Sequence, residues 1–152
     1  MKMKDRVVIV TGGSSGIGKA ASISFANESA VVIVADKIEN PREGGKDTVS
    51  EILDMGGISI FRKTDMTAEN EVSKLFDFVV SKYGKVDVVV NNAAISLNKS
   101  VLDTSADEFM QVIDNNLKSA FLGCKYAIKH MLGRMKTYSQ TNSIRRSRLI
   151  VC

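Results

Sequence analysis

RVVIVTGGSSGIGK, at residues 6–19, is the stretch of this sequence that decides the fold. It begins with an uninterrupted apolar run, which is typical of a strand covered by helices on both faces of a parallel sheet. A glycine-rich loop follows the run, and a helical pattern begins directly after the loop. This order predicts a ligand site at the end of the first strand.

Three glycines give the loop its expected properties. Gly12 permits a tight turn, Gly16 lets the backbone approach a ligand closely, and Gly18 lets the next helix pack against the strand. That helix directs free N–H groups and the positive end of its dipole at the loop, which favours an anion such as a pyrophosphate. We therefore expect a dinucleotide site, although such a stretch also describes an ordinary flexible turn.

Composition indicates one ordinary globular domain. The 152 residues are 44% hydrophobic and 25% charged. No apolar run has membrane-spanning length, and no signal-peptide pattern precedes the first strand, so we expect a cytoplasmic protein. Cys124, Cys152 and the single histidine, His130, form no pattern typical of a disulfide framework, a metal site or a Ser-His-Asp triad. His130 is expected on a helix surface.

The net charge of +4 is unevenly distributed along the chain. Residues 1–114 carry 13 Lys and Arg against 17 Asp and Glu, whereas residues 115–152 carry 8 against none. A basic arm of this kind can bind nucleic acid or a membrane surface. The plainer alternative is a mixed domain that has lost or exchanged the acidic sequence that should follow.

Strand and helix patterns alternate after the glycine loop. Asn40 and Pro41 are typical of a helix start, although Gly44 and Gly45 weaken the first turns, and Gly84 suits a left-handed helix end. The rhythm predicts an α/β fold with a doubly wound parallel, Rossmann-like sheet. We expect helices at residues 17–26, 41–55 and 67–83 and strands at residues 30–35, 58–61 and 86–90.

Polar residues follow the ends of these strands. Asp36 closes the second strand about 20 residues past the loop, where a carboxylate accepts hydrogen bonds from the adenosine ribose and repels the 2′-phosphate of NADP. Lys37 beside it softens that exclusion, so we expect NAD, with NADP less favoured. A solvated loop aspartate is the alternative. The topology should bring Gly12, Asp36, Asp65 and Asn92 to one edge of the sheet.

A capping box formed by Ser105 and Glu108 begins the longest helical pattern. Asn116 lies on its apolar stripe, where a buried amide must find partners and can kink the helix. The stripe consists of Phe109, Val112, Ile113, Leu117, Ala120, Cys124, Ala127, Ile128, Met131 and Met135.

Three motifs resemble those of the short-chain dehydrogenase/reductase family: Thr11-Gly12-x-x-x-Gly16-x-Gly18, Asn91-Asn92-Ala93-Ala94 and Asn116-Leu117-x-x-x-Phe121. The resemblance covers residues 6 to about 135 and implies hydride transfer between a nicotinamide and an alcohol or carbonyl. It implies a cofactor site formed by Gly12, Ser14, Ser15, Gly16, Ile17, Gly18, Asp36, Asp65, Met66, Asn92, Ala93 and Ala94.

The same resemblance gives some of these residues particular roles. It places Asp65 and Met66 against the adenine, although Asp65 can equally be a loop residue before a helix cap at Thr67. It assigns Asn116 to the catalytic group, holding a water in a proton relay. A purely structural asparagine is the alternative, and the two roles can coincide. Ala94 departs from the family's glycine and should narrow the site slightly.

The resemblance ends where the remaining catalytic residues should lie. The family uses a strand serine and a Tyr-x-x-x-Lys pair, whose ammonium lowers the pKa of the phenol. None of Tyr83, Tyr126 and Tyr138 has a lysine four residues later. We expect residues 1–136 to be an incomplete NAD(P)-binding domain, truncated after four to five strands, and residues 137–152 to be a basic tail or the start of a fifth strand.

Two functions follow as hypotheses. The first is an NAD(H)-binding member of the short-chain dehydrogenase/reductase lineage. Its 152 residues should have negligible turnover, and only a full-length form should act on a small alcohol or carbonyl. The second is a non-catalytic nucleotide-binding or oligomerising regulatory module, because the fourth strand would lie at an unpaired edge where chains associate. Association at this edge, either as a homo-oligomer or with another subunit, is a further hypothesis, and nucleic-acid binding through the basic tail is a minor third one.

Overall fold

The computed structural model describes residues 2–138 of the chain and the side chains of residues 2–132. The sequence predicts either a basic tail or the start of a fifth strand at residues 137–152. Residues 137 and 138 end α5, and the rest of this segment lies outside the described residues. The elements are β1 (Val7–Thr11), α1 (Gly16–Asn27), β2 (Val31–Asp36), α2 (Thr48–Asp54), β3 (Ile58–Lys63), α3 (Glu69–Tyr83), β4 (Val88–Val90), α4 (Ala106–Ile113), the π-helical turn η1 (Asp114–Lys118) and α5 (Ser119–Tyr138).

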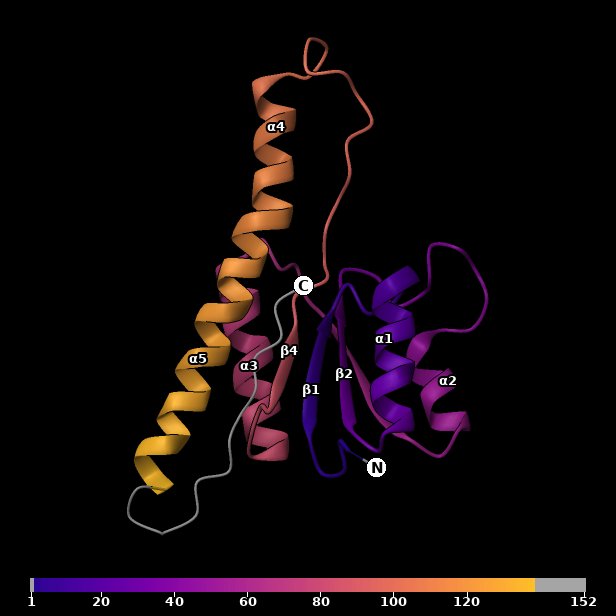
Figure 1. Ribbon diagram of the computed structural model, residues 1–152, viewed down its shortest axis with the longest axis vertical. Helices are drawn as coiled ribbons and strands as arrows, with labels where there is room; N and C mark the ends of the chain where they lie inside the picture. The colour runs from indigo at the N-terminus through magenta and orange to yellow at the C-terminus, as the bar shows by residue number, and fades with distance from the viewer. Residues whose placement is uncertain (1, 139–152) are drawn as a thin grey trace.

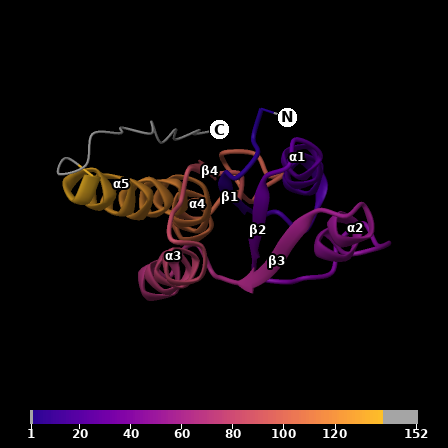
Figure 2. The ribbon, with the colours of Figure 1, turned by 90° about the horizontal axis from the view of Figure 1, so that it is seen from below.

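The four strands form one parallel sheet in the order β3-β2-β1-β4. Figures 1 and 2 show α1 and α2 on one face of this sheet and α3 with the long α4–α5 helix on the other. This arrangement confirms the Rossmann-like α/β fold that the sequence predicts. β4 lies at the edge of the sheet, and within residues 2–138 no strand pairs with its outer side.

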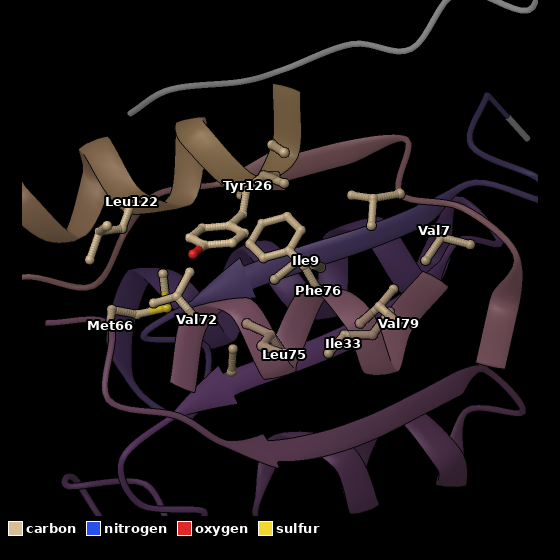
Figure 3. Packing of buried hydrophobic residues seen from close by; sticks show 14 of the residues in the cluster. Val7, Ile9, Ile33, Met66, Val72, Leu75, Phe76, Val79, Leu122 and Tyr126 are labelled. Carbon is tan, nitrogen blue, oxygen red and sulfur yellow. The ribbon is translucent and has the colours of Figure 1, made fainter. Parts of the chain in front are cut away.

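Alternating side chains of the strands divide the hydrophobic core into two layers. Ile9 and Ile33 pack toward α3 and α5, with Phe76, Leu122 and Tyr126 (Figure 3). The intervening residues of the same strands pack toward α1 and α2. Both layers are apolar because helices cover both faces of the sheet, which explains the uninterrupted apolar strands in the sequence.

The second helix is shorter than its sequence pattern predicts. It begins at Thr48 instead of Pro41, and the Asp47 carboxylate caps it by accepting a hydrogen bond from the Ser50 amide. Gly44 and Gly45 have φ angles of 80° and 88°, which a right-handed helix does not contain. Residues 41–47 therefore form a loop.

The third helix also begins later than expected. Ala68 occupies the N-cap position, and Thr67 instead donates its amide and hydroxyl hydrogens to the Asp65 carboxylate. The other end agrees with the prediction, because Gly84 has a left-handed conformation with a φ of 74°. The capping box of Ser105 and Glu108 is likewise confirmed at the start of α4.

The π-helical turn η1 changes which face of the long helix is buried. It contains Asn116, the residue at which the sequence allows the helix to be distorted. An extra residue in one turn rotates the following side chains, so Leu122 and Tyr126 are buried in α5. Of the predicted apolar stripe, Ala127 and Met131 are buried as expected, whereas three large members are exposed, namely Phe109, Leu117 and Ile128. The side chain of Met135 lies outside the described part.

His130 contradicts the expectation of a surface position. Its ring stacks on the Phe76 ring, with 6.0 Å between the ring centres and 3° between the planes. Burial lowers the pKa of His130, while Asp77, 3.5 Å away, acts in the opposite direction. His130 is therefore part of the packing between α3 and α5.

Among residues 2–138, no helix has the length and apolar character that a membrane crossing demands.

Candidate functional site

A cleft of about 280 Å³ opens at the carboxyl ends of the parallel strands. In open sheets of this kind, ligands bind outside the carboxyl ends, because the loops there diverge to opposite faces. Residues that the sequence predicts for a site make up most of its wall: Gly12, Ser15, Gly16, Asp36, Asp65, Met66, Asn92, Ala93 and Ala94. The structure thus confirms that the ends of β1, β2, β3 and β4 meet at one edge.

Thr11 and Asn92 join the ends of β1 and β4 beneath this cleft. The Thr11 hydroxyl accepts hydrogen bonds from the amides of Asn92 and Ala93, each at 3.0 Å, and donates to the Val90 carbonyl at 3.2 Å. The Asn92 side chain donates to the carbonyls of Thr11 and Gly12 at 3.0 and 3.2 Å. Because these polar groups are satisfied internally, they hold the floor of the cleft in one geometry.

Gly18 and Gly16 have opposite surroundings. A Cβ atom on Gly18 would lie 2.0 Å from the Gly12 carbonyl oxygen and 2.5 Å from the Asn92 side-chain nitrogen, so only glycine allows α1 to begin this close to the strands. Gly16 has a φ of 51°, and no atom lies within 4 Å of its Cβ position. Gly18 is therefore required for packing, whereas the backbone at Gly16 is exposed.

Asp36 is attached directly to the glycine loop. Its carboxylate accepts a hydrogen bond of 3.2 Å from the Ser14 amide and one of 2.7 Å from the Lys37 amide. The Ser14 hydroxyl is buried and has no hydrogen-bond partner within the described chain. A buried polar atom left without a partner is costly, so this hydroxyl suits a ligand or water at the loop.

Asp65 also lines the cleft and is paired with a cation. Lys37 contacts its carboxylate at 3.1 Å. Partial burial acts to raise the pKa of Asp65, but hydrogen bonds from Thr67 and Lys37 outweigh burial and hold the pKa below its ordinary value. Lys37 therefore neutralises Asp65, while Asp36 keeps its own contacts with backbone amides. The side chain of Met66 is 4% exposed and belongs mainly to the core (Figure 3).

Four predicted site residues do not line the cleft. Ser14 is buried in the glycine loop, Gly18 is buried in the first turn of α1, and Ile17 is 82% exposed on the same turn. Asn116 is held behind the wall, where its amide bonds the backbone of Ile95, itself a lining residue. Lys37, considered in the sequence only for its effect on the choice of nucleotide, also lines the cleft, and sequence reasoning missed six further lining residues, namely Arg42, Glu43, Thr64, Thr67, Ile95 and Asn115.

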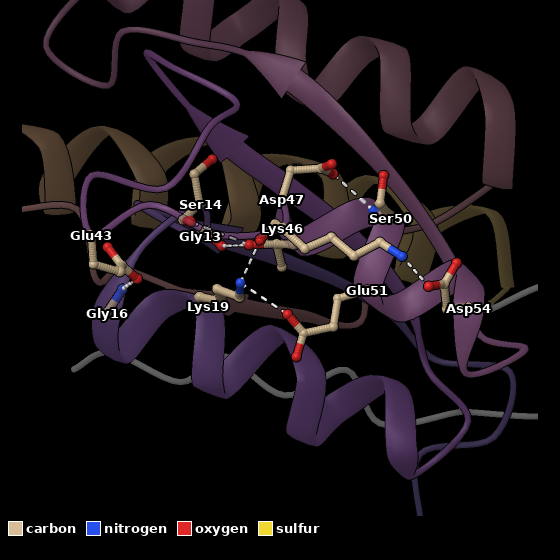
Figure 4. A network of polar contacts seen from close by, with 11 residues as sticks. Gly13, Ser14, Gly16, Lys19, Glu43, Lys46, Asp47, Ser50, Glu51 and Asp54 are labelled. Atoms are coloured by element: carbon tan, nitrogen blue, oxygen red, sulfur yellow. Dashed lines mark hydrogen bonds and ion pairs between the residues drawn. The ribbon is translucent and has the colours of Figure 1, made fainter.

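The loop between β2 and α2 accounts for two of these missed residues. Residues 41–48 lie against the glycine loop, and Figure 4 shows the polar contacts between the two segments. The Glu43 carboxylate accepts a hydrogen bond from the Gly16 amide at 2.9 Å, and the Arg42 amide donates to the Ser15 hydroxyl at 2.9 Å. No local pattern indicates these contacts, because the partners are 27 residues apart.

Across residues 2–138, no group of three or more His, Cys, Asp and Glu side chains is arranged to hold a metal ion.

The parallel sheet carries a glycine loop, Asp36 and Asn92 at one carboxyl edge, and these features define a Rossmann-like α/β protein. The family profile described as short chain dehydrogenase matches residues 6–138. The chain therefore belongs to the short-chain dehydrogenase family, whose members are oxidoreductases that use NAD or NADP.

Curated and solved relatives agree with this membership. The chain is 38% identical over 131 residues to a 3beta-hydroxysteroid dehydrogenase of Mediterraneibacter gnavus, covering 86% of this chain and 46% of that protein. It is 35% identical over 138 residues to zerumbone synthase of Zingiber zerumbet, covering 90% and 50%. A crystal structure of a short chain dehydrogenase from Mycobacterium avium superposes with a TM-score of 0.83 at 32% identity, covering 98% of this chain and 53% of that one. The chain thus spans about half the length of the relatives that it matches.

Proposed function

We propose that the cleft binds NAD(H), with NADP(H) as the weaker ligand. The observation that carries this proposal is the Asp36 carboxylate, which is attached to the Ser14 amide of the glycine loop and faces the same cleft as Gly16. In this position, a carboxylate can accept hydrogen bonds from both ribose hydroxyls of an adenosine, whereas it repels a 2′-phosphate.

Other residues of the cleft suit the remaining parts of such a ligand. The backbone of Ser15 and Gly16, which lines the cleft at the N-terminus of α1, suits a diphosphate. Asp65, adjacent to Met66, suits the adenine, and the small side chains of Ala93 and Ala94 suit a ribose. When bound, the nicotinamide supplies hydride transfer to or from an alcohol or carbonyl carbon.

Asn116 is proposed as the only member of the catalytic group within this chain. Its side-chain oxygen accepts one hydrogen bond from Ile95, and its side-chain nitrogen donates one to Ile95. One lone pair of the oxygen and one hydrogen of the nitrogen therefore stay available for a water. We expect residues 1–152 to bind the dinucleotide without appreciable turnover, because they lack a Tyr-x-x-x-Lys pair. A hydroxysteroid or another small alcohol is the substrate class proposed for a full-length form.

The test is a fluorescence titration of NADH and NADPH against the wild type and Asp36→Ala. We expect NADH to bind the wild type more tightly, and Asp36→Ala to weaken NADH by about tenfold, which corresponds to about 1.4 kcal/mol for lost ribose hydrogen bonds. The ratio of NADPH to NADH affinity should rise. Asp54→Ala, an exposed aspartate of α2, is the matched control and should change neither value. A correctly folded protein that binds neither nucleotide would contradict the proposal.

A second candidate function, an oligomerising module, is favoured by the exposed face of the long helix. Leu117, Phe121, Ile128 and Leu132 follow one another at helical spacing and are between 45% and 64% exposed. Four large apolar side chains in one line are typical of an association surface. A second copy of this chain is the proposed occupant. Analytical ultracentrifugation should give a dimer or larger species for the wild type and a monomer for Phe121→Lys, and a monomeric wild type would exclude this candidate.

A further inference from the structure

Residues 41–48, named here the strap, close over the glycine loop from the side of α2. Two contacts anchor the end of the strap that leads into α2, and a third joins α1 to α2. The Thr48 hydroxyl is buried and donates to the Gly13 carbonyl at 2.9 Å. Lys19 of α1 donates to the Lys46 carbonyl at 2.6 Å and pairs with Glu51 of α2 at 2.9 Å (Figure 4).

The other end of the strap puts a carboxylate on the glycine loop. Glu43 accepts a hydrogen bond from the amide of Gly16, the first residue of α1. This amide has no partner within the helix and lies at the positive end of the helix, where an anion is stabilised. The hydrogen bond from the Gly16 amide is the main cause that lowers the pKa of Glu43, so the carboxylate is ionised at neutral pH.

We propose that Glu43 is an internal competitor for the diphosphate of the nucleotide, and that the strap must release Gly16 before a dinucleotide binds fully. This inference rests on the proposed function, because it assigns a regulatory contact to the same cleft. Glu43 and a diphosphate oxygen cannot both accept the single Gly16 hydrogen, and two anions at one helix end repel each other.

The strap contains the flexibility that such a release requires. Gly44 and Gly45 directly follow Glu43, and both have left-handed φ angles with no atom within 4 Å of their Cβ positions. Glu43 itself is exposed. Rotation about this glycine pair can therefore move Glu43 outward while Thr48 and Lys46 keep α2 attached to the loop. Two exposed hydrogen bonds, from Gly16 to Glu43 and from Arg42 to Ser15, hold the end of the strap that carries Glu43, whereas the contact of Thr48 at the other end is buried.

Competition at Gly16 should depend on the diphosphate and not on the adenosine. Removing the charge by Glu43→Gln should tighten NADH and ADP-ribose by about three- to tenfold, since an exposed unit charge in water acts modestly on a nearby anion. Adenosine lacks the diphosphate, so its affinity should stay within twofold of the wild type. Glu39→Gln is the matched control, because Glu39 is an exposed glutamate of the same connection and has no contact with the glycine loop.

The experiment is isothermal titration of NADH, ADP-ribose and adenosine against the wild type, Glu43→Gln and Glu39→Gln, with the melting temperature of each variant recorded. Tighter binding of both diphosphates by Glu43→Gln alone supports the inference. Equal NADH affinities in all three proteins overturn it and leave the proposed function intact. If neither NADH nor ADP-ribose binds any of the three folded proteins, the proposed function fails and the competitor role fails with it.

A second measurement examines the contact without any nucleotide. In the ¹H–¹⁵N spectrum of the free protein, the Gly16 amide should move on Glu43→Gln and stay in place on Glu39→Gln. Addition of NADH to the wild type should then bring Gly16 to nearly the same position in all three proteins. If the chemical shift of the Gly16 amide in the free protein is unchanged by Glu43→Gln, the inference is overturned, whatever the result of the titrations.

Discussion

The side-chain amide of Asn116 forms a pair of hydrogen bonds with the backbone of Ile95. Its oxygen accepts from the Ile95 amide and its nitrogen donates to the Ile95 carbonyl, both at 2.9 Å. Asn116 lies in the π-helical turn of the long helix, and Ile95 lies in the segment that leaves β4 at the cleft. The asparagine therefore fixes one wall of the cleft, whatever further role it has.

Replacing Asn116 by Ala should destabilise the protein by about 1–3 kcal/mol, because two backbone groups of Ile95 lose their partner. Amide hydrogen exchange should increase at Ile95. Asn115→Ala is the control, since Asn115 donates only to the Gln111 carbonyl one turn before it, and its effect should stay within about 0.5 kcal/mol. Equal urea midpoints for the two variants would contradict this assignment.

Substituting Gly18 by Ala should disturb the first βα unit. A methyl group there meets the Gly12 carbonyl oxygen at 2.0 Å, and this backbone atom cannot move aside without breaking its bond with Asn92. We expect a loss of about 1–3 kcal/mol or more by urea unfolding. Ser24→Ala, an exposed site on the same helix, should change stability by less than about 0.5 kcal/mol. A Gly18→Ala protein as stable as the wild type would show that α1 can shift away from the loop.

The buried Asp87 carboxylate should make stability depend on acid. It contacts Arg6 at 3.0 Å, the Val7 amide at 2.9 Å and Lys85 at 2.8 Å, so it joins the start of β1 to the segment before β4. Burial acts to raise the pKa of Asp87, but hydrogen bonds from Lys85, Val7 and Arg6 lower it overall.

Because the folded-state pKa lies below the unfolded value of about 3.9, this contribution is complete above that pH and is lost as the pH falls through the folded pKa. Asp87→Asn should cost about 2–3 kcal/mol at pH 7 and flatten the acid limb of a stability profile measured by urea unfolding. Asp54→Asn, in an exposed pair with Lys46, should leave both nearly unchanged. An acid limb that survives in Asp87→Asn would assign it to other carboxylates.

His130 should add a second pH dependence at a higher pH. Burial against Phe76 lowers its pKa, so the unfolded chain takes up a proton first as the pH falls below about 6.5. The free energy of unfolding should therefore decrease as the pH falls from about 6.5 to the lower pKa of the folded protein. His130→Phe keeps an aromatic ring and should remove this part of the profile. NMR titration of the His130 ring gives the folded pKa directly, and a value above 6.5 would reverse the sign.

The parallel sheet and the residues at its carboxyl edge could be predicted, because their signals are local. Uninterrupted apolar runs such as Val7–Thr11 require covered strands, and glycines, Asp36 and Asn92 come directly after strands whose ends must meet. The start of α2 could not be placed, because nothing local shows that Gly44 and Gly45 adopt left-handed angles.

Periodicity, turn residues and chain order were thus enough for the sequence to determine the order of elements and the edge that carries the cleft, and the resemblance of three motifs predicted the family. Only the tertiary structure decided which polar atoms meet there. Glu43 reaches Gly16 from 27 residues away, Asn116 finds Ile95, and His130 stacks on Phe76. Such contacts join segments far apart in the chain, and they depend on the angles at which helices pack on the sheet, which no local pattern specifies.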